Sequence, residues 1–420
     1  MKRQISLFLC AVLALTGAAH AQERKVNYDE AKVPDYVLPE VLLSSSGKKI
    51  ENKKDWEKIR RPELLKIFSE EMYGTTPAEK IRVTHRVVED KKGVLEGKAD
   101  RRQVEFTFSN GRKEIKALLL VYTPAGVKGK VPFFIGYNFK GNHSTGTDPD
   151  ILYSEGFKRV KEPGHPDWVR GCQQNRWPVE YIISRGYGLA TMNYHDIFPD
   201  KEGLKDHSIV SLFRDYNRKP QPTDEWQAIG AWAWGSSRIL DYLEKQGNVG
   251  ETILMGHSRQ GKAALWAGAQ DPRFTIVISN DSGSGGAALS RREYGETIKI
   301  VSGIKPAWFA PALNKYHDNE QNMPFDQHEL IALMAPRPVY VASAEEDRWA
   351  DPKGEFLSAY YASPVYALYG LKGIPSDRMP ETEHPIQEGH IGYHIRKGIH
   401  DVTLYDWTQF MNFADMHLKR

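Results

Sequence analysis

Cysteine is nearly absent from this chain of 420 residues, which holds only Cys10 and Cys172, and long apolar runs are equally scarce. The one sustained run, residues 5–15, follows a basic start and precedes the small residues Ala19 and Ala21. These are the features of an export signal, and the run is too short to span a bilayer. We therefore expect residues 1–21 to be cleaved after about Ala21, leaving an exported protein, periplasmic or extracellular, that does not enter a membrane.

A large excess of one charge is also missing. Loss of Lys2 and Arg3 with the signal takes the formal net charge from +3 to +1. This near-neutral balance argues against nucleic acid as a partner. Because Cys172 is the one cysteine left after cleavage, no intramolecular disulfide is expected, yet a chain of this length buries an adequate core without one. We expect a monomer.

Short apolar strands alternate with helices through most of the chain. Residues 22–100 are polar and are interpreted as an N-terminal extension packed on the domain, with a helix over 55–73. Residues 101–420 begin with a hairpin at Asn110-Gly111 and then alternate, which predicts one domain with a mostly parallel sheet covered by helices on both faces. The expected strands are 103–109, 115–122, 131–137, 187–193, 252–255, 274–279, 338–342 and 391–395, and the expected helices are 178–185, 225–245, 262–270, 328–334, 356–368 and 406–417.

Two long segments lack a regular period. Residues 138–176 are rich in Gly, Pro, Asn and His and show no helical pattern, and residues 280–324 are also irregular. A loop of about forty residues in a compact domain is usually functional or disordered. We expect residues 138–176 to be ordered and to lie near the functional site.

Residues 252–261, TILMGHSRQG, carry the strongest motif. A β-prone run ends in a tight turn with Ser258 at its apex, and a helix-like segment follows. The spacing is G-x-S-x-x-G, one residue longer than the usual nucleophile elbow, in which glycines let strand and helix close beneath a strained serine. The helix N-terminus then offers N–H groups to developing negative charge. This context predicts an α/β-hydrolase fold with Ser258 as the nucleophile.

A serine nucleophile needs a histidine base, which follows the last strand in this fold. Four histidines lie late in the chain. His394 falls inside the expected last strand, where a core role is the simpler interpretation, and His390 precedes that strand at the opposite edge. His400 follows the strand in a loop that leads to the terminal helix, and His384 lies well before it. We therefore expect His400 to be the base.

Two aspartates are candidates for the acid that orients this histidine. Asp347 follows the expected strand 338–342, the usual position, and Asp281 follows the preceding strand, also at the carboxyl edge of the sheet. Neighbouring Glu345, Glu346 and Asp351 fit a solvated acidic face instead. The residues alone leave both aspartates open, and both lie close enough in this scheme to share the imidazole.

Several motifs resemble the glucuronoyl esterases of carbohydrate esterase family 15, over most of residues 100–415. The serine element G-x-S-R-x-G-K has that family's longer spacing, and an acid precedes Ser-Gly-Ser-Gly-Gly at 281–286. The other matching segments are REYGE at 292–296, NFKGNH at 138–143, RWP at 176–178 and the histidine-loop end at 401–407.

The resemblance implies roles for individual residues. Ser258 matches the nucleophile and Arg259 the arginine beside the oxyanion, while Lys262 matches a lysine that contacts the uronic-acid hydroxyls. Glu296 and Trp349 match residues that complete the sugar pocket. Asp281 stands where many members carry a catalytic glutamate, Asp347 matches the position used by others, and some bacterial members have acids at both.

There are departures from the family pattern. Fungal members have a cysteine before the serine, bridged to one beside the histidine, and His257 stands in the first of these places here. Asp281 is one methylene shorter than glutamate, and the family's pocket glutamine has no clear match. A bacterial member without the disulfide is therefore expected.

The resemblance implies a serine esterase that cleaves the ester between glucuronic acid on xylan and a lignin alcohol, with no metal or organic cofactor. The substrate would be glucuronoxylan or a lignin–carbohydrate ester. An acetyl-xylan or other carbohydrate esterase is the alternative on the same fold. A non-catalytic carbohydrate-binding protein is the alternative from another class, against which Ser258, His400 and the two acids argue.

Overall fold

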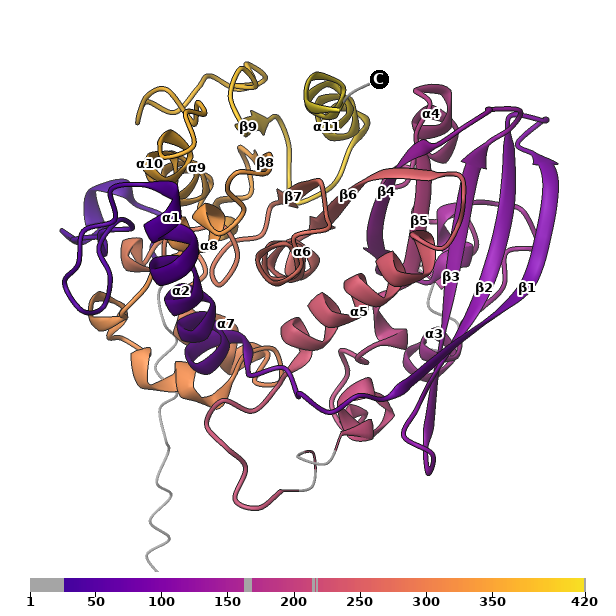
Figure 1. Ribbon diagram of the computed structural model, residues 1–420, viewed down its shortest axis with the longest axis horizontal. Helices are drawn as coiled ribbons and strands as arrows, with labels where there is room; N and C mark the ends of the chain where they lie inside the picture. The colour runs from indigo at the N-terminus through magenta and orange to yellow at the C-terminus, as the bar shows by residue number, and fades with distance from the viewer. Residues whose placement is uncertain (1–25, 162–167, 214–215, 217, 419–420) are drawn as a thin grey trace, which may run out of the picture.

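A computed structural model describes residues 26–161, 168–213, 216 and 218–418; the predicted signal, residues 1–21, lies outside them. At its centre is a nine-stranded sheet in the order β1-β2-β3-β5-β4-β6-β7-β8-β9 (Figure 1). The strands are β1 (Arg82–Val94), β2 (Ala99–Ser109), β3 (Glu114–Pro124), β4 (Val131–Asn138), β5 (Gly188–Asn193), β6 (Val249–His257), β7 (Ile276–Asn280), β8 (Val339–Ala344) and β9 (Ile391–Arg396). Pairs from β5 through β9 are parallel, and β1, β2, β3 and β5 are joined antiparallel.

Helices cover both faces of the sheet, as predicted (Figure 1). They are α1 (Lys53–Asp55), α2 (Arg61–Phe68), α3 (Glu155–Val160), α4 (Val179–Ser184), α5 (Ala228–Leu243), α6 (Arg259–Gln270), α7 (Ile298–Ile304), α8 (Gln327–Ala332), α9 (Pro352–Tyr361), α10 (Ser363–Ala367) and α11 (Leu404–His417). Helices α4 and α11 pack on one face, and α5, α6, α8 and α9 lie with the core of the other. Among the described residues no helix is both long and apolar enough to cross a membrane.

The buried strands contribute alternate side chains to the hydrophobic cores on the two faces of the sheet. In β6, Ile253 and Met255 join the core under α4 and α11, while Leu254 joins the core under α5 and α6. In β8, Tyr340 and Val341 divide between the two faces in the same way. Because successive side chains point to opposite faces, a strand covered on both sides must be apolar throughout. This is why the continuous apolar runs predicted these strands correctly.

The carboxyl ends of the parallel strands meet along one edge. Ser258 directly follows β6, Asp281 follows β7, Asp347 comes three residues after β8, and His400 comes four residues after β9. Residues that are far apart in the sequence are therefore neighbours at this edge, where open α/β sheets bind their ligands.

The edge strand β1 was not predicted. It has thirteen residues, and most of them are exposed or half-buried, so it lacks the apolar run that marks the inner strands. It pairs antiparallel with β2 from Arg82↔Ser109 to Val94↔Ala99. The predicted boundary at residue 100 falls inside this antiparallel unit. Backbone hydrogen bonds to β2 hold this strand in the sheet, and such bonds do not require a periodic pattern of apolar residues in the sequence.

Three further expectations need correction. Residues 138–176 contain a 3-10 turn, η4 (Asn142–Thr145), and the helix α3, although no helix was expected there. The irregular stretch 280–324 contains α7. The single helix expected over 356–368 is two helices, α9 and α10, with a proline in the first turn of the second. A proline is tolerated in a first helical turn but not in a helix interior, so the break falls there.

The predicted helix over 55–73 is present as α1 and α2, extended by the π-helical segments η2 (Trp56–Arg60) and η3 (Ser69–Tyr73). Trp56, Leu64, Phe68, Met72 and Tyr73 are buried in the core on the α6 side, and its other apolar residues pack partly buried against that core. Arg60 forms a buried ion pair with Glu329 at 2.5 Å, and the Tyr73 hydroxyl donates to the Gly285 carbonyl at 3.0 Å. The N-terminal segment therefore supports the loop that follows β7.

Candidate active site

Ser258 stands on a strained turn between β6 and α6. Its φ is +56°, a backbone conformation that costs energy in a residue with a side chain. A Cβ at Gly256 would lie 1.9 Å from the Gln260 carbonyl oxygen, and one at Gly261 would lie 2.8 Å from the Cβ of Ser282. Both glycines are therefore required for β6, α6 and the β7 loop to close around the serine. The added residue of the G-x-S-x-x-G spacing places its second glycine against the β7 loop.

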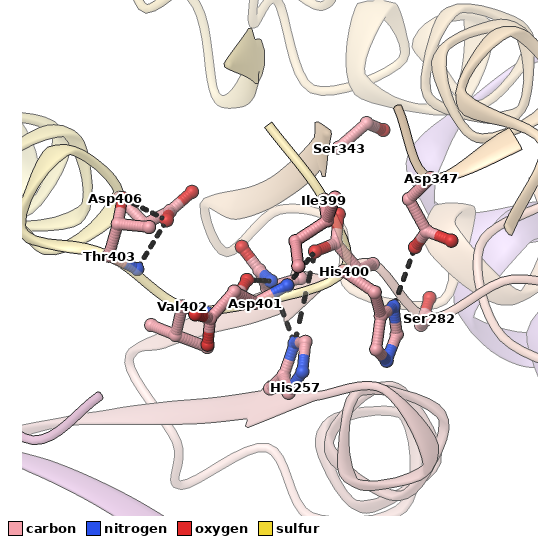
Figure 2. Close-up of polar contacts among 12 residues, drawn as sticks. His257, Ser282, Ser343, Asp347, Ile399, His400, Asp401, Val402, Thr403 and Asp406 are labelled. Carbon is pink, nitrogen blue, oxygen red and sulfur yellow. Dashed lines mark hydrogen bonds and ion pairs between the residues drawn. The ribbon is translucent and has the colours of Figure 1, made fainter. Parts of the chain in front are cut away.

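His400 is hydrogen-bonded to Asp347. The distance from His400 Nδ1 to Asp347 Oδ2 is 2.6 Å (Figure 2). A carboxylate acceptor fixes the proton on Nδ1 and leaves Nε2 free to accept one, the arrangement a base requires. Asp347 is buried, whereas the His400 side chain is 39% exposed. Ser258 and His400 together line two cavities, so the imidazole and the serine face the same space.

Asp281 is close to this pair but is held by other partners. Its Oδ2 accepts from Arg396 Nη2 at 3.3 Å and from the Asp401 N–H at 3.4 Å. Burial raises the pKa of Asp281 well above its ordinary value, and the nearby carboxylates Glu355 and Asp347 add to the shift. Of the two acids left open by the sequence, Asp347 is therefore the one bonded to His400, and Asp281 lies buried behind it.

Arg396 fixes the loop that carries His400. Its guanidinium donates to the backbone carbonyls of Lys397, Ile399 and Asp401 at 2.6–2.9 Å. Its Nε is paired with Asp406 at 2.8 Å. Because the donors of a buried arginine must all be satisfied, these bonds leave the loop few alternative conformations. This role was not predicted, since a single arginine at a strand end forms no pattern.

His257 and Asn280 link the serine turn to the histidine loop. Asn280 Nδ2 lies 2.9 Å from His257 Nδ1 and donates to the Asp401 carbonyl at 3.1 Å. The rings of His257 and His400 lie with centroids 4.5 Å apart. Burial lowers the pKa of His257 well below its ordinary value, reinforced by the charges around it, so this imidazole is neutral. A hydrogen-bonded bridge thus joins the two segments that a disulfide joins in the fungal pattern.

Glu355 of α9 secures the loop after β7. Its Oε1 accepts from the N–H groups of Ser282 and Gly283 at 2.7 and 3.0 Å, and its Oε2 accepts from the Ser343 hydroxyl at 2.7 Å. Burial raises the pKa of Glu355 to about 8. This carboxyl therefore couples β7, β8 and α9 beneath the site.

The first cavity, here called the Lys262 cavity, has a volume of 410 Å³ and contains the three predicted sugar-binding residues Lys262, Glu296 and Trp349 in its wall. Lys262 is 3% exposed and donates to the Ser282 and Ser284 carbonyls at 2.7 and 2.5 Å and to Glu296 at 3.0 Å. Its three donors each have an acceptor in the protein. Lys262 therefore ties the β7 loop to the opposite wall as well as lining the cavity.

The N-terminal residues described here form the outside of that wall. The Gly295 N–H donates to the Asn27 carbonyl at 2.8 Å, next to Glu296. Glu30 accepts from Arg292 Nη2 at 2.8 Å and from Lys353 at 2.6 Å. These contacts join residues near the beginning of the chain to the segments that carry Glu296 and Trp349.

Arg259 lies at the boundary between the two cavities. It is ion-paired with Asp200, which also accepts from Trp308 Nε1 at 2.9 Å and lies 3.3 Å from Lys305 Nζ. The guanidinium stacks over Trp308 at 4.8 Å. Asp200 and Trp308 were missed from the sequence. Asp200 lies beyond the carboxyl end of β5, a position that could have identified it, while Trp308 is in the irregular stretch and carried no signal.

The second cavity, here called the Lys140 cavity, has a volume of 420 Å³ and lies on the other side of Ser258 and His400. Phe139, Lys140, Trp168 and Arg176 contribute to its wall, so the segment 138–176 does border the site, as expected. Lys140 Nζ lies 4.4 Å above the Trp168 ring.

Three side chains of the site carry the carboxylate and imidazole groups that can bind a metal ion. Donor atoms of Asp281, Asp347 and His400 lie within 4.8 Å of one another. The 2.6 Å separation of His400 and Asp347 is a hydrogen-bond distance, and Asp281 already accepts a hydrogen bond from Arg396. The chemistry of these neighbours fits an acid–histidine pair better than a cation site.

A serine on a strained strand-to-helix turn, with an aspartate-bound histidine at the same sheet edge, defines a serine hydrolase of the α/β-hydrolase class. Residues 187–370 match a family model described as glucuronyl esterase, fungi. A carbohydrate esterase from an unknown prokaryotic organism is 41% identical over 409 residues, covering 95% of this chain and 94% of the relative. The chain belongs to the glucuronoyl esterase family, carbohydrate esterase family 15, as its motifs predicted.

Two other relatives agree. The solved glucuronoyl esterase from Solibacter usitatus is 45% identical, with a TM-score of 0.85, covering 93% of this chain and 100% of that one. A 4-O-methyl-glucuronoyl methylesterase from Wolfiporia cocos is 34% identical over 290 residues, 63% of this chain and 67% of the relative.

Proposed function

We propose that this protein is a serine esterase that hydrolyses the ester between the carboxyl group of (4-O-methyl-)glucuronic acid on xylan and a lignin alcohol. The Solibacter and Wolfiporia relatives are named for glucuronoyl ester hydrolysis. The observation that carries the proposal is that Ser258 and His400 open into the same cavity as Lys262, Glu296 and Trp349. A uronate acyl group held there would present its ester carbon to the serine.

In the proposed mechanism His400 Nε2 takes the proton of Ser258 as its oxygen attacks the ester carbonyl. Asp347 holds the imidazole in the required tautomer and stabilises its positive charge. The tetrahedral intermediate collapses, His400 gives the proton to the departing alcohol oxygen, and an acyl-enzyme remains. Water, deprotonated by His400, then releases the glucuronate and restores Ser258.

The oxyanion is proposed to form at the start of α6. The N–H groups of Gly261 and Lys262 bond the Ser258 carbonyl, which leaves those of Arg259 and Gln260 for the substrate oxygen. The guanidinium of Arg259, oriented by Asp200, adds a positive charge beside it. Donors fixed before the reaction stabilise the developing charge without reorganisation.

The test compares methyl 4-O-methyl-glucuronate with an acetylated xyloside. The proposal expects hydrolysis of the glucuronate ester, reduced by about 10⁴-fold or more in Ser258→Ala because the nucleophile is lost. Activity on the acetate alone would make this an acetyl esterase. Binding of the glucuronate without turnover by the unmodified protein would make it a carbohydrate-binding protein.

We also propose that the protein is exported, cleaved after about Ala21, and monomeric. The basic start, apolar run and small residues at the N-terminus support export and cleavage. Mass spectrometry of the protein recovered outside the cytoplasm would give the cleavage site, and light scattering the molecular mass. An unprocessed chain or a dimer mass would contradict the corresponding part.

A further inference from the structure

The two cavities share four lining residues, and an ester consists of an acyl part and an alkoxy part. Ser258, Arg259, Lys305 and His400 line both the Lys262 cavity and the Lys140 cavity. If the Lys262 cavity holds the acyl part of an ester, as proposed above, the carbonyl carbon lies at this shared boundary. The alkoxy part must then extend toward the Lys140 cavity, because the acyl part fills the other direction.

The Lys140 cavity carries an excess of positive charge. Among the described residues that line it, Asp200 is the one carboxylate, and it is already paired with Arg259 and Lys305. Burial lowers the pKa of two of its three histidines, to about 3 for His195 and well below the ordinary value for His257, so these two add no charge at neutral pH. Its cationic lining residues are Lys140, Arg176, Lys201, Arg259 and Lys305.

Two of these cations have no carboxylate partner in the described chain. Lys140 rests on the Trp168 ring, and Lys201 Nζ has only the Val160 carbonyl at 3.4 Å. By contrast, Arg176 is paired with Asp401 at 2.5 Å. An unpaired ammonium beside an aromatic face attracts a group that is itself flat and negatively charged, because stacking and charge then act together.

We propose that the Lys140 cavity is the leaving-alcohol subsite and that it selects aromatic alcohols bearing an anionic group, such as a ring carboxylate. Trp168 and Phe139 supply the aromatic wall. Lys140, held over Trp168, supplies the charge that meets the anion. This rests on the proposed esterase function and adds to it a preference for one class of alcohol.

The experiment compares benzyl glucuronate with 4-carboxybenzyl glucuronate. The preference is the ratio of the two kcat/KM values, from which changes common to both substrates cancel. Lys140→Met keeps an apolar stem on Trp168 and removes the charge, and it should lower the ratio about fivefold at low salt. Added salt should lower the ratio of the unmodified protein in the same direction, because the attraction is screened.

Lys158→Met is the matched control. Lys158 lies on α3 within the same segment, is exposed and paired with Glu155, and lines neither cavity. The Lys158→Met substitution removes one positive charge from the same segment of the chain. It should leave the ratio of the two kcat/KM values unchanged. An equal fall in both lysine variants would show a general charge effect and overturn the subsite.

A second measurement does not need turnover. Binding of 4-carboxybenzyl alcohol and of benzyl alcohol to the intact protein is measured by titration calorimetry. The carboxylated alcohol should bind more tightly, and Lys140→Met should remove that difference. If no glucuronate ester is hydrolysed but this difference persists, the proposed function fails and the subsite stands. If esters are hydrolysed with an unchanged ratio in Lys140→Met, or the alcohols bind alike, the subsite is wrong.

Discussion

The two cavities beside Ser258 are built in different ways. The Lys262 cavity is formed by loops that follow adjacent strands, and its buried lysine is paired with Glu296 and two backbone carbonyls. The described wall of the Lys140 cavity comes mainly from the segments after β4 and β5, with cations that are half-buried or exposed. Closely paired groups fix one geometry, whereas unpaired charges tolerate several ligands. The comparison indicates strict recognition of the acyl side and looser recognition of the alcohol side.

The largest effect should come from Asp347, and the smaller effect of Asp281 in the same cavity is its control. Asp347→Asn removes the acceptor that fixes the His400 tautomer, and kcat should fall about 10⁴-fold for every ester. Asp281→Asn replaces a carboxyl whose pKa is raised, and should cost only about threefold. Steady-state kinetics of both variants decide this. A loss at Asp281 as large as that at Asp347 would show that the two acids share the histidine.

Arg259 belongs to both cavities, so its replacement should not distinguish between alcohols. Arg259→Ala should lower kcat by about 10²- to 10³-fold, the usual cost of losing one oxyanion donor. The decrease should be the same for methyl and benzyl glucuronate. An effect confined to the benzyl ester would place Arg259 in alcohol binding alone.

Lys262→Met tests whether this lysine is a tether as well as a sugar contact. Glu296 and two carbonyls would lose their donor in a buried place, so the free energy of unfolding should fall by about 3 kcal/mol. Denaturant unfolding measures this, with Lys158→Met as the unaffected control. Unchanged stability with reduced kcat/KM would assign Lys262 to the substrate alone.

The last prediction concerns the pH dependence of stability on the Lys262 side only. The folded pKa of Glu355, about 8, exceeds its ordinary value of 4.5, so between these values the unfolded chain loses a proton that the folded protein keeps. The free energy of unfolding therefore decreases as pH rises through this window, by at most about 1.4 kcal/mol per pH unit. Glu355→Gln should flatten this slope. Denaturant unfolding at several pH values checks it, and an unaltered slope would contradict it.

The sequence predicted the parallel sheet and the serine turn because each has a local signature. Apolar runs mark doubly covered strands, and Gly256 is required by its contact with Gln260, four residues along the chain. It could not choose between Asp281 and Asp347, since both follow neighbouring strands at one edge. Arg396 was missed because its role depends on carbonyls gathered by a loop, which have no sequence pattern.

The contacts of Asn27 and Glu30 close a very long loop of the chain. Their partners Gly295, Arg292 and Lys353 are separated from them by more than 250 positions, as the 262-residue span from Glu30 to Arg292 shows. Closing so long a loop costs entropy that only late tertiary contacts repay. The outer wall beside Glu296 therefore depends on contacts that span most of the chain, and it forms only when residues 27–30 have docked against 292–295 and Lys353.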